Sequence, residues 1–260
     1  MAFDDWVDQA TPADLDALAQ ALADGRIPDR PSSGSIQRAG FEDAVVRFMD
    51  GLGTVEPRVV SWMLGRLARE RRAADDRYAQ VARLVWSGAS DDQEAIRDTR
   101  VVLEDLFARA ERYVLIATYV VYDGRRIFAR LAERLRARPG LQVEMFVNLD
   151  PNISPGDEDA DVREYLRQFA AAHWPEDLPL PAIYYDPQAQ STEGKRTALH
   201  AKCVVVDDRW AFVTSANFTE AAQARNIEAG VLLDHPRLAA ALAARFRALS
   251  ASGTLKEMRA

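Results

Sequence analysis

The amino-acid sequence predicts an α/β domain with a mainly parallel or mixed sheet flanked by helices, preceded by an all-helical N-terminal domain. In residues 1–88, apolar side chains recur every three or four positions, which is the spacing of amphipathic helices. From about residue 90 onward, short runs rich in Val, Ile and Tyr alternate with helical segments, as they do in α/β domains. We therefore expect a helical domain at 1–88 and a second domain at 89–260.

The first expected helix covers residues 11–24. Thr11 suits the N-cap, Pro12 suits the first helical position, and Gly25 ends the helix. Two more helices are expected to carry apolar stripes at Phe41, Val45, Phe48 and Met49 and at Val59, Trp62, Met63 and Leu67. A last helix of this domain is expected at about 73–86.

In the second domain, β-branched and aromatic residues indicate strands, and Gly and Asp indicate turns. The expected strands lie at 113–122, 141–148, 182–185, 203–206, 210–213 and 226–233. The expected helices lie at 92–111, 125–138, 161–172 and 236–249. This alternation is the basis for the predicted fold class.

Seven polar residues near the C-terminal end form the most informative pattern. By spacing they read H-x-K-x4-D, S-x-N and N-x-E: His200, Lys202, Asp207, Ser215, Asn217, Asn226 and Glu228. Because side chains two apart in a strand share a face, His200 and Lys202 project together. The apolar run at 203–206 predicts a buried strand, and the strand after it would bring Ser215 and Asn217 beside the first pair.

This string resembles the signature of the phospholipase D superfamily, in which H-x-K-x4-D is followed by G-S-x-N and N-x-E. The resemblance covers roughly residues 90–250 and leaves the N-terminal helices outside it. It implies a phospholipase D-like catalytic domain. Thr214 stands where the family usually has glycine, a residue that permits a close backbone approach to a ligand. Thr214 is therefore expected to narrow the site or change its substrate while leaving the side-chain chemistry in place.

The resemblance also implies the chemistry. His200 would attack phosphorus to form a phosphohistidine, and Lys202 and Asn217 would hold the non-bridging oxygens. Neither a metal ion nor another cofactor is then expected. Glu228 matches the family position that orients the histidine ring.

Three further residues complete the expected site. Ser215 would bond its polar groups, and Asn226 would support Glu228 from the same strand face. Asp207 is a catalytic candidate, although the resemblance favours a structural hydrogen bond at the strand end.

The sequence indicates the substrate less clearly than it indicates the reaction. The net charge of −7 argues against general attraction to polyanions, so any nucleic-acid contact must be local. Lys195 and Arg196, just ahead of His200, are the best-placed substrate-binding candidates. A second basic cluster on a predicted helix is explained equally well as a solvated face: Arg58, Arg66, Arg69, Arg71 and Arg72.

The expected function is that of a metal-independent phosphodiesterase, specifically a nuclease that contacts DNA or RNA. The alternatives are a phospholipase D-type lipid hydrolase and a non-catalytic nucleic-acid-binding or scaffolding component. The helical N-terminal segment also resembles that of phospholipase D-like components of bacterial anti-phage defence systems. This resemblance implies protein partners from such a system at the N-terminal helices.

One histidine cannot both attack phosphorus and protonate the leaving group on the opposite side. The family solves this with two paired motifs, so a chain with one motif implies a twofold homodimer.

The single Cys203 has no disulfide partner, and no apolar run is long enough to cross a bilayer. We therefore expect a cytoplasmic protein without membrane contact.

Overall fold

The structure, a computed structural model, describes residues 5–28, 31–88, 98–149, 158–190 and 197–259. Contacts within the chain divide it into two compact units, Met1–Gln80 and Val81–Ala260. Each unit is described by itself.

The first unit is helical. It consists of α1 (Asp5–Gln9), α2 (Pro12–Ala23), α3 (Ser33–Arg38), α4 (Asp43–Leu52) and α5 (Pro57–Val81). The expected start of α2 is confirmed: the hydroxyl of Thr11 accepts the Asp14 amide, and the Asp14 carboxylate accepts the Thr11 amide. Gly25 follows the helix with a φ of 70°, a conformation that glycine adopts without steric cost.

Helix α5 buries a different face from the one predicted. Its buried residues are Val60, Leu64 and Ala68, whereas Trp62 and Met63 are 65% and 54% exposed. The sequence places apolar residues on two sides of this helix, and spacing alone does not show which side packs.

Three of the five arginines in the basic cluster have partners inside the unit. Arg66 pairs with Glu70, Arg71 donates to the Ala10 carbonyl and Arg72 pairs with Asp16.

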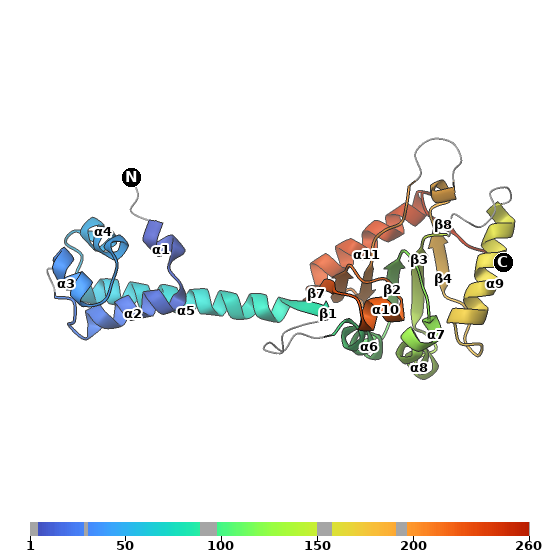
Figure 1. The fold of residues 1–260 in the computed structure, drawn as a ribbon, viewed down its shortest axis with the longest axis horizontal. Helices are drawn as coiled ribbons and strands as arrows, with labels where there is room; N and C mark the ends of the chain where they lie inside the picture. The colour runs from blue at the N-terminus through green and yellow to red at the C-terminus, as the bar shows by residue number, and fades with distance from the viewer. Residues whose placement is uncertain (1–4, 29–30, 89–97, 150–157, 191–196, 260) are drawn as a thin grey trace. The chain divides into compact units, whose positions relative to one another are not determined.

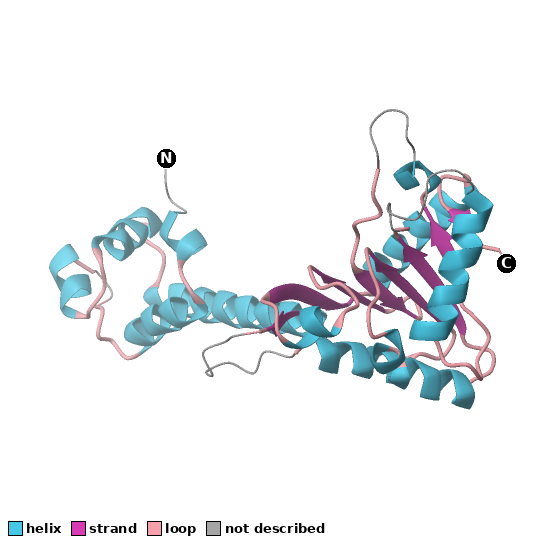
Figure 2. Ribbon diagram, turned by 45° about the vertical axis from the view of Figure 1, so that its right-hand side comes forward, coloured by secondary structure: helices cyan, strands magenta, loops and turns pink. Residues whose placement is uncertain are grey.

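The second unit contains one mixed sheet (Figures 1 and 2). Its strands are β1 (Ala82–Ser87), β2 (Tyr113–Thr118), β3 (Gln142–Val147), β4 (Ala182–Tyr185), β5 (Cys203–Val206), β6 (Trp210–Thr214), β7 (Glu228–Asp234) and β8 (Lys256–Glu257). The strand order is β1-β7-β6-β5-β2-β3-β4-β8. Only the β2–β3 and β3–β4 pairs are parallel, so the predicted mixed sheet is confirmed.

Helices cover both faces of this sheet (Figure 1). One face packs against α6 (Thr99–Arg109), α7 (Gly124–Ile127), α8 (Ala129–Ala137) and α9 (Glu158–His173). The other face packs against α11 (Pro236–Ala251) through Ala239, Ala243 and Phe246. A short helix, α10 (Glu220–Ala224), and a 3-10 turn, η1 (Pro187–Gln190), lie in the connections. The strands at the centre of the sheet are buried on both faces, which explains their unbroken apolar runs.

The predicted helix at 73–86 is wrong beyond Val81. Residues 82–87 form β1, which pairs antiparallel with β7, with Val85 opposite Gly230. A pairing partner almost 150 positions away in the sequence decides this conformation, so local periodicity did not show it. The division between the units therefore falls after Gln80, whereas the sequence placed it at 88. The start of the predicted helix at 92–111 lies outside the described residues.

None of the helices within the described ranges is long and apolar enough to cross a membrane.

Candidate active site

The signature residues meet at one end of the sheet because of its strand directions. Strand β5 runs antiparallel to β6, and β6 runs antiparallel to β7. The start of β5, the end of β6 and the start of β7 therefore lie side by side. The end of β2 joins them, since Ala117 pairs with Cys203. Six of the seven predicted residues lie at or just beyond these strand ends: His200, Lys202, Ser215, Asn217, Asn226 and Glu228.

His200 and Lys202 are in direct contact. The Lys202 Nζ lies 3.0 Å from Nδ1 and 3.2 Å from Nε2 of the His200 ring, and it donates to the His200 carbonyl at 2.8 Å. An ammonium group only donates, so a bond between the two requires a ring nitrogen with a free lone pair, and the tautomer decides which of the two nitrogens has it. An unprotonated ring nitrogen is what a nucleophilic histidine needs. The imidazole is exposed, whereas Lys202 is only 8% exposed.

The charge of Lys202 depends on two opposing effects. Burial lowers the pKa of its ammonium, and the nearby Glu228 carboxylate raises that pKa. Burial is the larger effect, so the ammonium loses its proton more easily than a surface lysine does. A buried positive charge at a sheet end suits the binding of a phosphoryl oxygen.

Tyr119 is a site residue that the sequence did not indicate. Its ring centroid lies 5.1 Å from that of His200, and the Lys202 Nζ lies 5.8 Å from the Tyr119 centroid. Tyr119 directly follows the last residue of β2, Thr118. Only the adjacency of β2 and β5 brings it to His200, and that adjacency is not encoded in local spacing.

Glu228 belongs to a polar network with two other predicted residues. The Ser215 hydroxyl donates to the Glu228 carboxylate, and the Asn226 side chain donates to it at 3.5 Å. The Ser215 oxygen also accepts the Ala229 amide at 3.2 Å. The structure shows no hydrogen bond between Glu228 and His200, both of which it describes. Within a single chain, the polar side chain that contacts the imidazole is therefore Lys202 and not Glu228.

Asn217 is half-buried. Its Oδ1 is buried and has no hydrogen-bond partner among the described residues. Leaving a buried acceptor unpaired costs roughly 1–3 kcal/mol, and such groups concentrate at functional sites. The unpaired Oδ1 can only accept a hydrogen bond, so a phosphoryl oxygen would have to be bound by the Asn217 amide nitrogen instead.

Asp207 lies at the other end of β5. Its carboxylate accepts the amides of Glu111 and Arg112 at 2.7 Å and that of Tyr113 at 2.9 Å. Five residue steps separate it from Lys202, a span of roughly 16 Å at about 3.3 Å a residue. Through these three hydrogen bonds, Asp207 links the start of β2 to the turn after β5. The structure does not bring it together with the other six residues.

Two other substrate-binding candidates, Lys195 and Arg196, lie outside the described residues. Within the described ranges, no three His, Cys, Asp or Glu side chains are grouped so that they could hold a metal ion.

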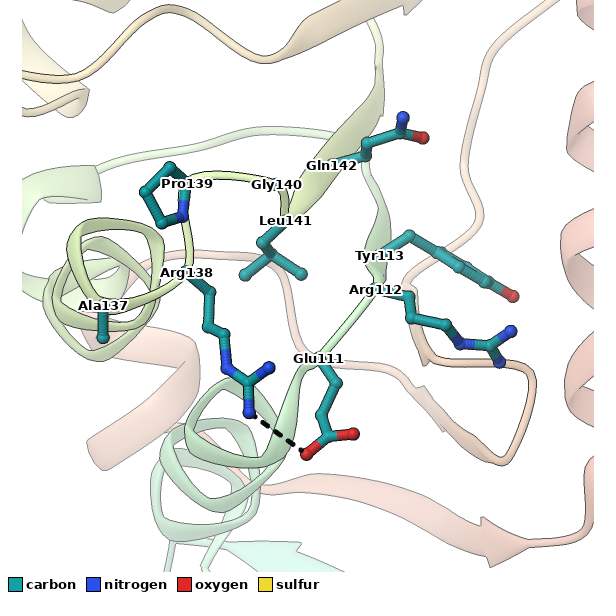
Figure 3. Close-up of a pocket in the computed structure, with 9 residues that line it drawn as sticks. All are labelled: Glu111, Arg112, Tyr113, Ala137, Arg138, Pro139, Gly140, Leu141 and Gln142. Atoms are coloured by element: carbon teal, nitrogen blue, oxygen red, sulfur yellow. Dashed lines mark ion pairs between the residues drawn. The ribbon is translucent and has the colours of Figure 1, made fainter.

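A pocket of about 490 Å³ lies at the same end of the sheet as Asp207 (Figure 3). It is lined by residues just before β2 and β3, and the pocket residue Arg138 pairs with Glu111 at 3.6 Å. Burial and the Asp208 carboxylate raise the pKa of the pocket residue Tyr113 to about 12, so its hydroxyl stays protonated. Its other arginine, Arg112, pairs with Asp208 at 3.8 Å. Because both arginines are paired and the phenol is protonated, we assign no reaction to this pocket.

Comparison with known proteins gives one family match. Residues 103–250 match the family described as "Cardiolipin synthase, PLD-like domain". A curated relative is the DISARM protein DrmC of Bacillus paralicheniformis, which is 25% identical over 161 residues. That similarity covers 62% of this chain, and the chain spans about 60% of the length of this relative.

Three solved structures show a loose backbone likeness. Nuc from Salmonella typhimurium, a phospholipase D family member, has a TM-score of 0.44 at 16% identity, covering 69% of this chain and 98% of Nuc. NucT from Helicobacter pylori has a TM-score of 0.41 at 17% identity, covering 56% of this chain and 84% of NucT. Phosphatidylserine synthase from Haemophilus influenzae has a TM-score of 0.44 at 16% identity, covering 75% of this chain and 47% of that protein.

The family match extends over more than half of the chain and includes strands β2 to β7 and the polar residues at their end. The chain therefore belongs to the family of phospholipase D-like domains.

Proposed function

We propose that this protein is a phosphodiesterase with His200 as its nucleophile. The observation that carries the proposal is the contact between the Lys202 ammonium and the His200 ring, at a sheet end where the half-buried Asn217 also lies. This arrangement offers a nucleophile, a fixed positive charge and a polar ligand for one phosphoryl group. Metal ions are not required, because Lys202 supplies the charge that stabilises the phosphoryl oxygens.

The proposed reaction has two steps. A lone pair on the unprotonated ring nitrogen of His200 forms a bond to phosphorus, and the bond from phosphorus to the leaving oxygen breaks. That oxygen leaves with the electron pair and takes a proton from a general acid. Water then gives a proton to the conjugate base of that acid and attacks phosphorus, and the nitrogen–phosphorus bond breaks with its electron pair returning to the ring nitrogen. Glu228 affects this reaction indirectly. Its carboxylate favours the charged form of Lys202, and its hydrogen bond with Ser215 holds that side chain in place.

We propose nucleic acid as the substrate. Support comes from two basic residues, Lys195 and Arg196, which stand just ahead of His200 in the sequence and suit contact with a phosphate backbone. Digestion of labelled single-stranded DNA, duplex DNA, RNA and phosphatidylcholine in parallel, with and without EDTA, tests this proposal. We expect cleavage of nucleic acid in the presence of EDTA and none by the His200→Ala variant. Cleavage of the lipid alone would establish the alternative lipid hydrolase. If no substrate is cleaved, the non-catalytic alternative stands.

We also propose that the active unit is a twofold homodimer, in which the second His200 serves as the general acid. The chain supplies one His-x-Lys pair, so a single copy lacks an acid opposite the nucleophile. An exposed apolar row crosses three strands beside the site. In this row Leu84 of β1 pairs with Val231 of β7, which pairs with Val213 of β6. Burial of this row against a second copy would remove it from water.

A role in anti-phage defence is proposed from the relative DrmC and the N-terminal unit. On α5, Trp62 and Met63 form an exposed apolar patch next to Arg58 and Arg69, which have no ion pair within the described residues. Tryptophan, methionine and arginine are enriched at protein interfaces, and the free arginines favour an acidic partner surface. Purified proteins of the same defence system should bind the wild-type chain and not the Trp62→Ala variant. Equal binding by both would exclude this patch.

We propose a cytoplasmic location. Cys203 is buried, and burial raises the pKa of its thiol to about 12, so it is unreactive and unpaired as expected in a reducing compartment. Fractionation of cells that express the tagged chain tests this location.

A further inference from the structure

Thr214, the last residue of β6, makes two hydrogen bonds with its side chain. Its hydroxyl accepts the amide of Ala216 at 3.1 Å and donates to the carbonyl of Ala229 at 3.4 Å. Its own amide donates to the carbonyl of Lys202 at 3.1 Å. The side chain thus closes a local turn over Ser215, the kind of side-chain turn that serine and threonine form with the amide two residues on.

The amide of Ala216 depends on this turn. Ala216 is only 2% exposed, and the Thr214 hydroxyl is the acceptor that its amide has among the described residues. A buried amide without an acceptor is strongly disfavoured. The turn lies between Ser215, which bonds Glu228, and Asn217, which has the unpaired amide oxygen. Its geometry therefore decides where both side chains point.

Gly230 lies opposite Thr214 in the sheet and makes room for it. A Cβ atom at Gly230 would lie 3.0 Å from the Thr214 Cβ, 2.7 Å from the Phe212 ring and 2.9 Å from the Val213 carbonyl oxygen. Directly opposite side chains normally keep their Cβ atoms about 4.5–5.5 Å apart. The side chain at 214 and a side chain at 230 are therefore incompatible at the observed strand spacing.

We propose that Thr214 is a positioning residue of the active site and that Gly230 is its structural complement. The hydroxyl of Thr214 fixes the turn that presents Ser215 and Asn217, and the absence of a side chain at Gly230 lets the strands hold Thr214 there. Thr214 touches no reacting atom and acts through its two neighbours. The inference deepens the proposed phosphodiesterase function and rests on it for its effect on turnover.

Replacement of Thr214 by valine and by serine separates the hydroxyl from the side-chain shape. Thr214→Val keeps the branched shape and removes the acceptor, whereas Thr214→Ser keeps the acceptor. We expect Thr214→Val to lower kcat at least tenfold with KM changed less than about threefold, because a small displacement of a positioned group acts mainly on the transition state. Thr214→Ser should stay within about threefold of the wild type. Equal kcat values for the two variants would overturn the positioning role.

Amide hydrogen exchange gives a measurement that does not depend on activity. The Ala216 amide should exchange slowly in the wild type and in Thr214→Ser, and at least tenfold faster in Thr214→Val. If exchange is unchanged in Thr214→Val, the proposed turn is wrong. If the wild type cleaves no phosphodiester, the proposed function fails, and the exchange rates alone decide whether Thr214 holds the turn.

The complementarity with Gly230 has its own test. Gly230→Ala should lower the melting temperature by more than about 5 °C. Thr214→Gly should lower it too, because it removes the acceptor of the Ala216 amide. The double variant should therefore lose less than the sum of the two single losses, since the clash between positions 214 and 230 is counted only while both side chains are present. Wild-type melting of Gly230→Ala, or strictly additive losses, would overturn the complementarity. If Gly230→Ala does not fold, a double variant that folds supports the complementarity and one that does not fold overturns it.

Discussion

Lys202 is bonded to His200 twice, through the imidazole and through the main-chain carbonyl, so the buried ammonium is held against the proposed nucleophile. The carbonyl bond of 2.8 Å fixes the lysine side chain across its own strand end. The two residues thereby form one unit before any substrate is bound, which is the preorganisation that electrostatic catalysis requires.

Replacement of Lys202 by methionine should abolish most activity without harming the fold. Methionine fills a similar volume and carries no charge, so the loss of the fixed cation should lower kcat by about 10²–10³-fold. The substitution also removes the desolvation cost of a buried ammonium, which offsets the loss of its hydrogen bonds. We expect a melting temperature within about 3 °C of the wild type, as determined by calorimetry. A large fall in melting temperature with normal turnover of the folded fraction would make Lys202 structural.

Glu228→Gln should change the pH dependence of turnover. The pKa of Lys202 is lowered by burial, and the Glu228 carboxylate counteracts that effect. Without the carboxylate, Lys202 loses its proton at a still lower pH, so the alkaline limb of the kcat/KM profile should move to lower pH. The matched control is Glu257→Gln on the edge strand β8, which removes one charge far from the site. An identical shift in both variants would contradict a specific effect of Glu228.

Asp207→Asn should reduce stability and spare turnover. The carboxylate accepts three backbone amides, and asparagine tolerates the φ of 53° at this position but offers one neutral acceptor. We expect a loss of about 1–3 kcal/mol in the free energy of unfolding, with kcat within threefold of the wild type. Asp208→Asn, which weakens a bond to the Tyr113 hydroxyl and an exposed ion pair with Arg112, should cost less. A fall in kcat with no change in stability would show that Asp207 is a catalytic residue.

Mixing wild-type and His200→Ala chains tests the homodimer. If each site needs His200 from both copies, mixed dimers are inactive, and activity should fall with the square of the wild-type fraction. A linear fall would show that each chain acts independently. Sedimentation of the same mixtures checks that dimers form, and an active monomer would contradict the shared site.

The sequence by itself predicted the family and much of the second unit. The spacing of His200, Lys202, Ser215, Asn217 and Glu228 follows from local rules, because strands at 203–206 and 210–213 joined by a tight turn must bring their polar flanks together. The start of α2 at Thr11 and the mixed character of the sheet were predicted for the same reason. Capping and strand alternation are properties of neighbouring residues.

The tertiary structure alone decided the contacts between distant segments. Residues 82–87 form β1 because β7 offers them a pairing edge, and Tyr119 reaches His200 because β2 lies beside β5. The burial of one face of α5, and the fit of Thr214 against Gly230, likewise depend on what packs there. Contacts between segments far apart in the sequence depend on the free energy of the whole fold, and the local propensities of the residues do not predict them.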